Sequence, residues 1–234
     1  MLSRRSSIIA GGTIALVVLV LLAGPLTKFG VLPWSAGLGL FALGSLVAAI
    51  GGLICLGIVI RNRGGMLASG GMVAGLAAAA VLAKIITGAG GAPEIHDITT
   101  DTSNPPLFVS VTPALRGDGS NSITYDPAIA PRQVAAYPGV RPRTITKSPA
   151  DVFDIATKAV VARGWTVVGA DSATGRIEAT DTSGWWGFKD DVVIRLRPDG
   201  DGTRIDIRSV SRVGRSDMGA NAARIEKLMA AIAG

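Results

Sequence analysis

The first 93 residues of this chain contain no aspartate and no glutamate, although the whole sequence has 17 acidic residues. The only charged side chains in this part are six basic ones at the edges of long uncharged stretches: Arg4, Arg5, Lys28, Arg61, Arg63 and Lys84. An uncharged apolar stretch of about 20 residues is typical of a membrane-spanning helix. Because a proton or ion relay needs ionisable side chains inside the spans, the missing carboxylates argue against a transporter or channel.

Cysteine and histidine are also nearly absent, with one residue of each, Cys55 and His96. A single cysteine excludes an intrachain disulfide and a cysteine-rich metal site, and we expect neither a metal nor a cofactor. A Ser-His-Asp triad would have to use His96, with Asp97 or Asp101 to orient the imidazole. No G-x-S-x-G, P-loop or dinucleotide-binding motif accompanies it. The sequence therefore favours a protein that is not an enzyme.

A net charge of +6 is compatible with nucleic-acid binding, but the distribution of the charge argues against it. After residue 93 the 17 acidic residues are balanced by 17 basic ones, so this part of the chain is neutral. A nucleic-acid-binding domain should itself carry the basic excess. We therefore expect no nucleic-acid partner.

Three uncharged stretches are each long enough to cross a hydrocarbon core of about 30 Å: residues 6–27, 29–60 and 64–83. The second is too long for one straight span, so its start, with Pro33 and Trp34, is interpreted as an interfacial turn. The predicted helices cover about residues 8–26, 35–60 and 65–87. They form a membrane domain at residues 1–90. A cleaved signal peptide at residues 1–24 is the alternative, but it lacks a clear A-x-A site and two further spans follow it.

The basic residues also predict an orientation, because positively charged loops stay in the cytoplasm. Two arginines precede the first span and two, Arg61 and Arg63, follow the second, whereas the loop between these spans has only Lys28. This pattern places the N-terminus in the cytoplasm, and three crossings then place the rest of the chain outside it. We predict a bacterial inner-membrane protein with a periplasmic domain at residues 91–234.

Small residues at intervals of four line the second and third spans: Gly44, Ala48 and Gly52, then Gly71 and Gly75. Small side chains at this spacing let two helix backbones approach closely. Two interpretations stay open, namely packing of the two helices within one chain and homo-oligomerisation through the same residues. Membrane lipids are the partners that the spans imply directly.

The chain after the spans starts with a flexible tether and continues with a proline-rich stretch. Nine of the 12 prolines lie between Pro93 and Pro149. Because proline disrupts helices, this stretch is predicted to be irregular and to wrap the domain core. One short strand is expected near residues 107–111.

Regular patterns begin at Ser148, an N-cap residue followed by a proline. An amphipathic helix ending at Gly164 precedes four alternating segments, which turn sequences join into two hairpins: residues 165–170, 176–181, 191–197 and 203–213. Ser216 or Asp217 is predicted to cap a last helix that reaches about Ala233. The predicted fold is α+β, in which three transmembrane helices precede a two-layer domain with an antiparallel sheet of about four or five strands and two helices.

Several segments of this part also carry a family resemblance: residues 95–106, 164–165, 175–180 and 190–195, and above all Arg208-Ser-Val-Ser-Arg-Val-Gly-Arg-Ser-Asp-Met-Gly-Ala-Asn221. They resemble domain-of-unknown-function family 1499 (DUF1499), and the resemblance covers about residues 94–232. The family is known from bacteria and plants, often after membrane helices, and has no established activity, cofactor or catalytic residue. The resemblance therefore implies a domain boundary near residue 94 and assigns no chemistry.

The last of these segments holds the richest set of polar side chains in the sequence. One interpretation is a cross-strand ladder of arginines and carboxylates on a solvent-exposed sheet face. The other is a binding site for a phosphate, a lipid headgroup or an acidic glycan at the start of the last helix, where free N–H groups favour negative charge. The candidate ligand-binding residues are Arg208, Arg212, Arg215, Ser216, Asp217 and Asn221.

Two further candidates lie between the hairpins. Adjacent tryptophans cannot both point inward from an extended strand, so Trp185 or Trp186 is predicted to enter a membrane interface, stack on a sugar or face a partner. Packing of both rings against the domain is the alternative. Asp190 and Asp191 are candidates for a metal or acid–base pair, although no oxygen-rich ligand pattern surrounds them.

These patterns favour an inner-membrane protein whose periplasmic domain is a binding or scaffolding module of the cell envelope, with an envelope protein, glycan or lipid as partner. A lipid- or glycan-binding module that uses the arginines and tryptophans is the first alternative. An envelope hydrolase that uses His96 or the Asp190–Asp191 pair is the second. The patterns assign no role to the segment from Tyr125 to Arg143.

Overall fold

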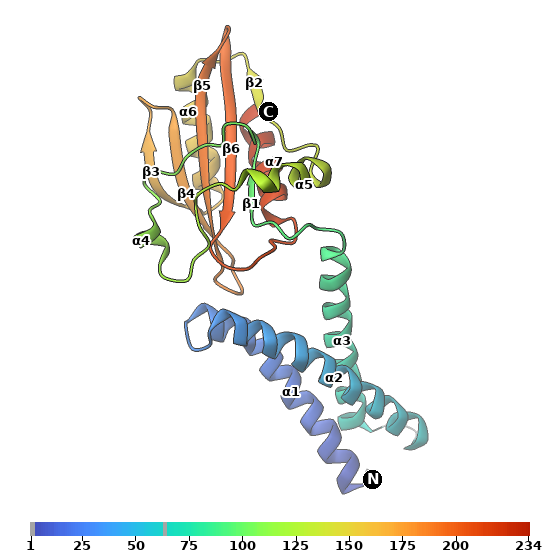
Figure 1. Ribbon diagram of the computed structural model, residues 1–234. Coiled ribbons are helices and arrows are strands. Elements are labelled where there is room, and N and C mark those ends of the chain that lie inside the picture. Colours follow the sequence, from blue (N-terminus) through green and yellow to red (C-terminus); the bar gives the residue numbers. More distant parts are fainter. Residues whose placement is uncertain (1–2, 63–64) are drawn as a thin grey trace. The chain divides into compact units, whose positions relative to one another are not determined.

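The computed structural model describes residues 3–62 and 65–234 (Figure 1). They fall into two units, one within Met1–Gly90 together with Gly184–Gly187, and the other within Gly91–Ser183 and Phe188–Gly234.

Three helices make up the first unit: α1 (Arg4–Lys28), α2 (Trp34–Asn62) and α3 (Met66–Ala89). Each is long and apolar enough to cross a membrane, which confirms the three helices expected from the uncharged stretches. Ser3 begins α1 because its hydroxyl accepts a hydrogen bond from the Ser6 N–H. Arg63, on which the predicted orientation depends in part, lies outside the described residues.

Three of the small residues, Ala48 and Gly52 of α2 and Gly75 of α3, lie where these two helices are in backbone contact. A Cβ atom added at Gly75 would collide with the Ala48 carbonyl oxygen and the Gly52 backbone. A Cβ atom at Gly44 would instead meet Val20 of α1. Contacts within one chain therefore use these positions, as expected for a helix pair that packs through small side chains.

The second unit is an α+β domain, as predicted. Its main elements are α6 (Pro149–Ala162), β3 (Thr166–Asp171), β4 (Arg176–Thr182), β5 (Lys189–Asp199), β6 (Gly202–Ser211) and α7 (Ala220–Ala233). The sheet is antiparallel in the order β1-β6-β5-β4-β3. Two short strands, β1 (Asp97–Thr99) and β2 (Arg143–Ile145), lie one after the other along β6 and bring the sheet to six strands.

Local sequence explains where these elements begin and end. The Ser148 hydroxyl accepts a hydrogen bond from the Asp151 N–H and begins α6, with Pro149 as the first helical residue. Gly164, at φ +71°, follows the end of this helix in a backbone conformation that favours glycine. Alternate residues of the strands, such as Ile205 and Ile207, pack with α6 and α7 in one apolar core. Figure 1 shows both helices behind the sheet.

The other face of the sheet is covered by the proline-rich stretch, as predicted, and Figure 1 shows this green segment crossing in front of the strands. It includes α4 (Pro113–Arg116), a 3-10 turn (η1, Pro127–Ile129) and α5 (Ala130–Ala136). The predicted cross-strand ladder of arginines and carboxylates is present on this face, where Arg195 and Arg197 of β5 bind Asp206 of β6. Its predicted exposure to solvent is wrong. Glu178, Asp206 and Arg208 are fully buried because the stretch lies over them.

Two predicted element boundaries are also wrong. Residues 107–111 form no strand, because the carboxylate of Glu178 accepts the three N–H groups of residues 109–111 at 2.7–2.9 Å. The last helix begins at Ala220, later than a cap at Ser216 or Asp217 predicts, although the Asp217 carboxylate does accept the Asn221 N–H in its first turn. Met218 and Gly219 have φ angles of 54° and 84°, which a right-handed helix cannot contain.

Candidate functional site

Residues 100–136, from the end of β1 to the end of α5, are called the covering segment from here on. Arg208 is the centre of a buried polar cluster beneath this segment. Its guanidinium binds the Asp97 carboxylate through two hydrogen bonds, of 2.9 Å from Nε and 2.6 Å from Nη2, and donates to two backbone carbonyls of the covering segment. The rings of Phe108 and Tyr125 lie 5.4 and 5.5 Å from it. Burial, followed by the Asp97 charge, raises the pKa of Tyr125 to about 12. Arg208 is therefore fully engaged inside the domain.

Arg212 is likewise paired, with Asp191 on the neighbouring strand. Its Nε and Nη2 atoms lie 2.9 and 2.8 Å from the two carboxylate oxygens, and Thr180 donates a third hydrogen bond to Asp191. A second buried guanidinium, that of Arg116, lies 3.4 Å from the same carboxylate. Burial lowers the pKa of Arg116, while the Asp191 charge opposes this shift. One carboxylate thus balances two arginines.

The carboxylates Asp190 and Asp191 do not form a pair. Asp190 binds Arg224 of α7 on one face of the sheet, whereas Asp191 binds Arg212 on the other. Neighbouring residues of a strand point to opposite faces. The two carboxylates are therefore not placed to act together as a metal or acid–base pair. Among the residues that the structure describes, no group of three acidic, histidine or cysteine side chains is placed to hold a metal ion.

The remaining candidates of the arginine-rich segment hold the chain that leads into β1. Each contacts one residue between Pro93 and Asp97: Arg215 binds the Glu94 carboxylate at 2.9 Å, the Ser216 hydroxyl donates to the Pro93 carbonyl at 3.1 Å, the Asp217 N–H donates to the Ile95 carbonyl at 3.2 Å, and the Asn221 amide donates to the His96 carbonyl at 3.0 Å. The arginine-rich motif, residues 208–221, thus holds the chain before β1 in place.

The start of α7 already has a carboxylate of the chain itself. Asp217 accepts hydrogen bonds from the N–H groups of Gly219 and Asn221 at 2.9 and 2.8 Å. Burial raises the pKa of Asp217, and these two hydrogen bonds oppose the shift. An external anion at this helix end would be repelled by the Asp217 carboxylate, which already accepts two of the N–H groups there.

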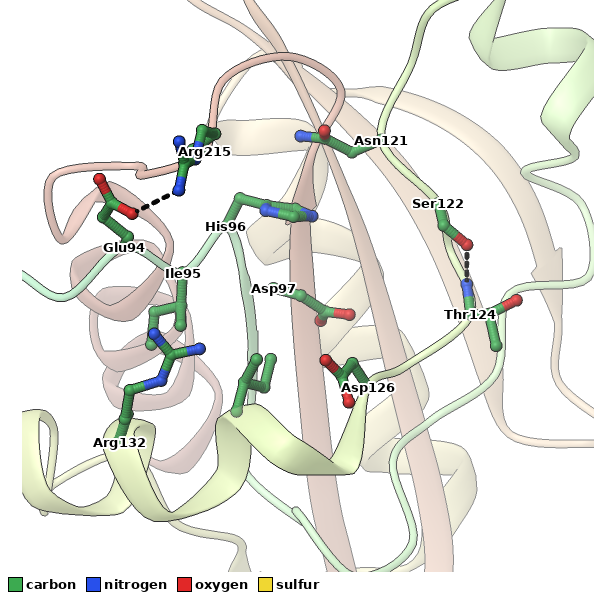
Figure 2. Close-up of a pocket in the computed structure, with 11 residues that line it drawn as sticks. Glu94, Ile95, His96, Asp97, Asn121, Ser122, Thr124, Asp126, Arg132 and Arg215 are labelled. Carbon is green, nitrogen blue, oxygen red and sulfur yellow. Dashed lines mark hydrogen bonds and ion pairs between the residues drawn. The ribbon is translucent and has the colours of Figure 1, made fainter.

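A pocket of about 390 Å³ opens beside residues 94–97. Its lining comes from the segment before β1, the covering segment, the start of α5 and the loop before α7 (Figure 2): Glu94, Ile95, His96, Asp97, Asn121, Ser122, Thr124, Asp126, Ile129, Arg132 and Arg215. Of the candidate residues, only Arg215 lines it. Trp185 is 49% exposed and Trp186 half-buried, and neither lines the pocket.

The charges of the pocket are balanced but not all paired. Arg208 neutralises Asp97, and Arg215 lies against Glu94. The side chains of Asp126 and Arg132 have no ion-pair partner within 4.0 Å in the described part of the chain. Asp126 only caps the η1 turn, accepting the Ala128 N–H at 2.9 Å. One carboxylate and one guanidinium are thus available to a ligand.

His96, the only histidine, is half-buried, and its ring points into the pocket in Figure 2. In residues 3–62 and 65–234 its imidazole makes no hydrogen bond to a serine or a carboxylate. A catalytic triad requires such a contact between base and nucleophile. The described residues therefore contain no assembled Ser-His-Asp triad around His96.

Comparison with known families adds one finding. The family model described as "Protein of unknown function (DUF1499)" matches residues 97–232. The chain belongs to this family. The DUF1499 match begins at the first residue of β1 and ends within α7, so it contains the whole sheet and excludes α1, α2 and α3. No curated protein matches the chain.

Sequence reasoning missed the two residues of the DUF1499 domain that carry the available charges, Asp126 and Arg132. The Asp126-Pro127 dipeptide is a recognisable turn or N-cap signal, and it locates the η1 turn. It does not place that turn beside β1. That proximity depends on how the covering segment folds over the sheet.

Proposed function

We propose that this protein is an inner-membrane protein whose DUF1499 domain lies in the periplasm and binds a small polar ligand, a lipid headgroup or a glycan. The distribution of Lys and Arg around the three helices supports this orientation. The ligand site is the pocket beside β1. The observation that carries the proposal is the presence of one carboxylate and one guanidinium there, Asp126 and Arg132, without ion partners among the described residues.

The charge balance of the pocket determines which ligands fit it. A simple anion would be attracted by Arg132 but repelled by Asp126. A simple cation would be attracted by Asp126 but repelled by Arg132. A zwitterion satisfies both side chains. A hydroxyl-rich ligand also satisfies them, because each hydroxyl both donates and accepts a hydrogen bond.

Calorimetric titration of the full-length protein in mild detergent tests this proposal. The probes are glycerophosphoethanolamine as a zwitterion, maltose as a polyol and inorganic phosphate as a simple anion. We expect one of the first two to bind, and to bind at least tenfold more weakly to the variants Arg132→Gln and Asp126→Asn. Asparagine retains the capping oxygen at position 126, so the η1 turn is preserved.

The matched controls are Lys158→Gln and Asp154→Asn, which remove the same charges from exposed positions of α6. Both control variants should bind the probe as tightly as the unmodified protein does. Binding of phosphate alone, or equal binding by the pocket and control variants, would show that the pocket does not act as proposed.

A scaffolding role is the second candidate, and the contacts of the arginine-rich motif favour it. Nearly all of its side chains bind groups of the domain itself, and four of them fasten the segment Pro93–Asp97. Purification of the full-length protein with a stoichiometric envelope protein, and without any ligand in the pocket, would support this role.

A further inference from the structure

A second hollow, of about 460 Å³, lies against the pocket. Its lining is largely apolar: Thr102, Ser103, Pro105, Leu107, Phe108, Ile123, Thr124, Tyr125 and Pro127. Leu107 is 70% exposed in it. An apolar side chain of this size gains free energy when it is covered. The hollow is therefore suited to an apolar group.

The chain from Ser122 to Pro127 separates the polar pocket from the apolar hollow. The even-numbered residues of this chain line the pocket, and the odd-numbered residues line the hollow. Thr124, which is exposed, lines both, so the two spaces lie on either side of this residue. A ligand with a charged end and an apolar end would occupy both by crossing the chain over Thr124.

We propose that the two spaces together bind one zwitterionic phospholipid, with its headgroup in the pocket and an acyl chain in the hollow. This inference rests on the binding function proposed for the pocket. The guanidinium of Arg132 matches a phosphate, to which it can donate two parallel hydrogen bonds. The carboxylate of Asp126 matches the ammonium group of the headgroup. A phosphatidylglycerol headgroup would also offer its phosphate to Arg132, but it gives Asp126 neutral hydroxyls in place of an ammonium group and so lacks the second ion pair.

The position of the pocket in the sequence favours a membrane lipid over a soluble amphiphile. The third helix ends at Ala89, and the pocket lining begins at Glu94. Only residues 90–93 join the two in the sequence. Because α3 is long and apolar enough to cross a membrane, phospholipid is the most abundant amphiphile that this protein meets.

Native mass spectrometry of the full-length protein, with added lipid in detergent, tests the inference. Phosphatidylethanolamine is compared with phosphatidylglycerol of the same acyl chains. We expect the ethanolamine lipid to be retained at least fivefold better. Its retention should fall at least fivefold in Arg132→Gln, which changes the headgroup site, and in Leu107→Asp, which places a charge in the hollow.

Val161→Asp is the control for the hollow, because Val161 is 60% exposed on α6. Leu107→Ser is a milder variant, used if Leu107→Asp does not fold. Equal retention of the two lipids, unaffected by these variants, means that the lipids only surround the helices and overturns the inference. If glycerophosphoethanolamine binds in an Arg132-dependent way but the Leu107 variants retain lipid normally, the pocket binds ligand and the phospholipid inference fails. If the binding of lipid, of headgroup and of maltose is in every case independent of Arg132, both proposals fail.

Discussion

At the scale of single residues, the domain depends on arginine–carboxylate pairs that are buried beneath the covering segment. A buried pair adds little net stability over an apolar pair, but the loss of one partner leaves an uncompensated charge. Asp97 with Arg208 and Asp191 with Arg212 are pairs of this kind. Arg208 and Arg212 also donate to backbone carbonyls of the covering segment, those of Pro106, Ile123 and Leu115, and so help to hold that segment over the sheet.

The variant Asp191→Asn should be strongly destabilised. It leaves the guanidinium groups of Arg116 and Arg212 buried without their anion, and we expect the free energy of unfolding to fall by about 3–5 kcal/mol. Urea unfolding of the full-length protein, followed by tryptophan fluorescence, measures this loss. Asp201→Asn, in the exposed β5–β6 turn, is the control. A loss as small as that of the control would contradict the role given to the pair.

Asp101 should contribute an acid-sensitive part of the stability. Burial raises its pKa, but hydrogen bonds from Ser103 and Asn104 and the charges of Arg204 and Arg195 outweigh burial and lower it from the ordinary value of 3.8. Because the folded-state pKa is the lower one, this contribution is complete above pH 3.8 and is lost as the pH falls through the folded-state value. Between pH 5 and 2 the stability of Asp101→Asn should therefore change less than that of the unmodified protein. Parallel pH profiles would refute this assignment.

At the scale of elements, a single side chain takes the place of a strand partner. The carboxylate of Glu178 accepts the N–H groups of Val109, Ser110 and Val111, and Arg176 lies 3.2 Å from the same carboxylate. In Glu178→Gln one acceptor oxygen is replaced by a donor NH₂ group. We expect faster hydrogen exchange at residues 109–111, measured by mass spectrometry. Glu226→Gln, at an exposed position of α7, is the control and should leave hydrogen exchange at residues 109–111 unchanged. Unchanged exchange in Glu178→Gln as well would contradict the role given to Glu178.

The helix pair α2–α3 should tolerate no side chain at its closest contact. A leucine in place of Gly75 would separate the two helices, because even a Cβ atom there collides with the α2 backbone. We expect Gly75→Leu to lower the temperature at which the detergent-solubilised protein loses its monodisperse profile in size-exclusion chromatography. Gly57→Leu, at a position with open space around it, is the control. Equal midpoints for the two variants would contradict this packing.

At the scale of the whole molecule, the proposed orientation is the property to test. Alkaline phosphatase fused to the C-terminus should be active, and a fluorescent protein at the same place should stay dark if exported through the general secretory route. Moving Arg61 and Arg63 into the loop after Lys28 should weaken this orientation, because the basic loops would then lie on the other side. A brightly fluorescent C-terminal fusion would overturn the periplasmic assignment.

Most of the architecture follows from local pattern. Uncharged stretches predict α1, α2 and α3, and alternation with turn residues predicts β3, β4, β5 and β6, because periodicity and turn chemistry are properties of neighbouring residues. The two missing strands, β1 and β2, have three residues each, too few for a period to be recognised. They form because β6 offers an unpaired edge.

The sequence alone determined the division between apolar helices and a neutral α+β domain, and the family resemblance as well. Only the tertiary structure decided that Arg208 and Arg212 each form a buried ion pair with an aspartate. It also decided that Asp126 and Arg132 line the same pocket. Arg208 and its partner Asp97 are 111 residues apart in the chain. This pairing depends on the short strand β1 adding to the edge of β6, where Thr99 lies opposite Arg208. The pocket depends on how the covering segment crosses the sheet. Both arrangements are set by many weak contacts between distant residues, which no local pattern encodes.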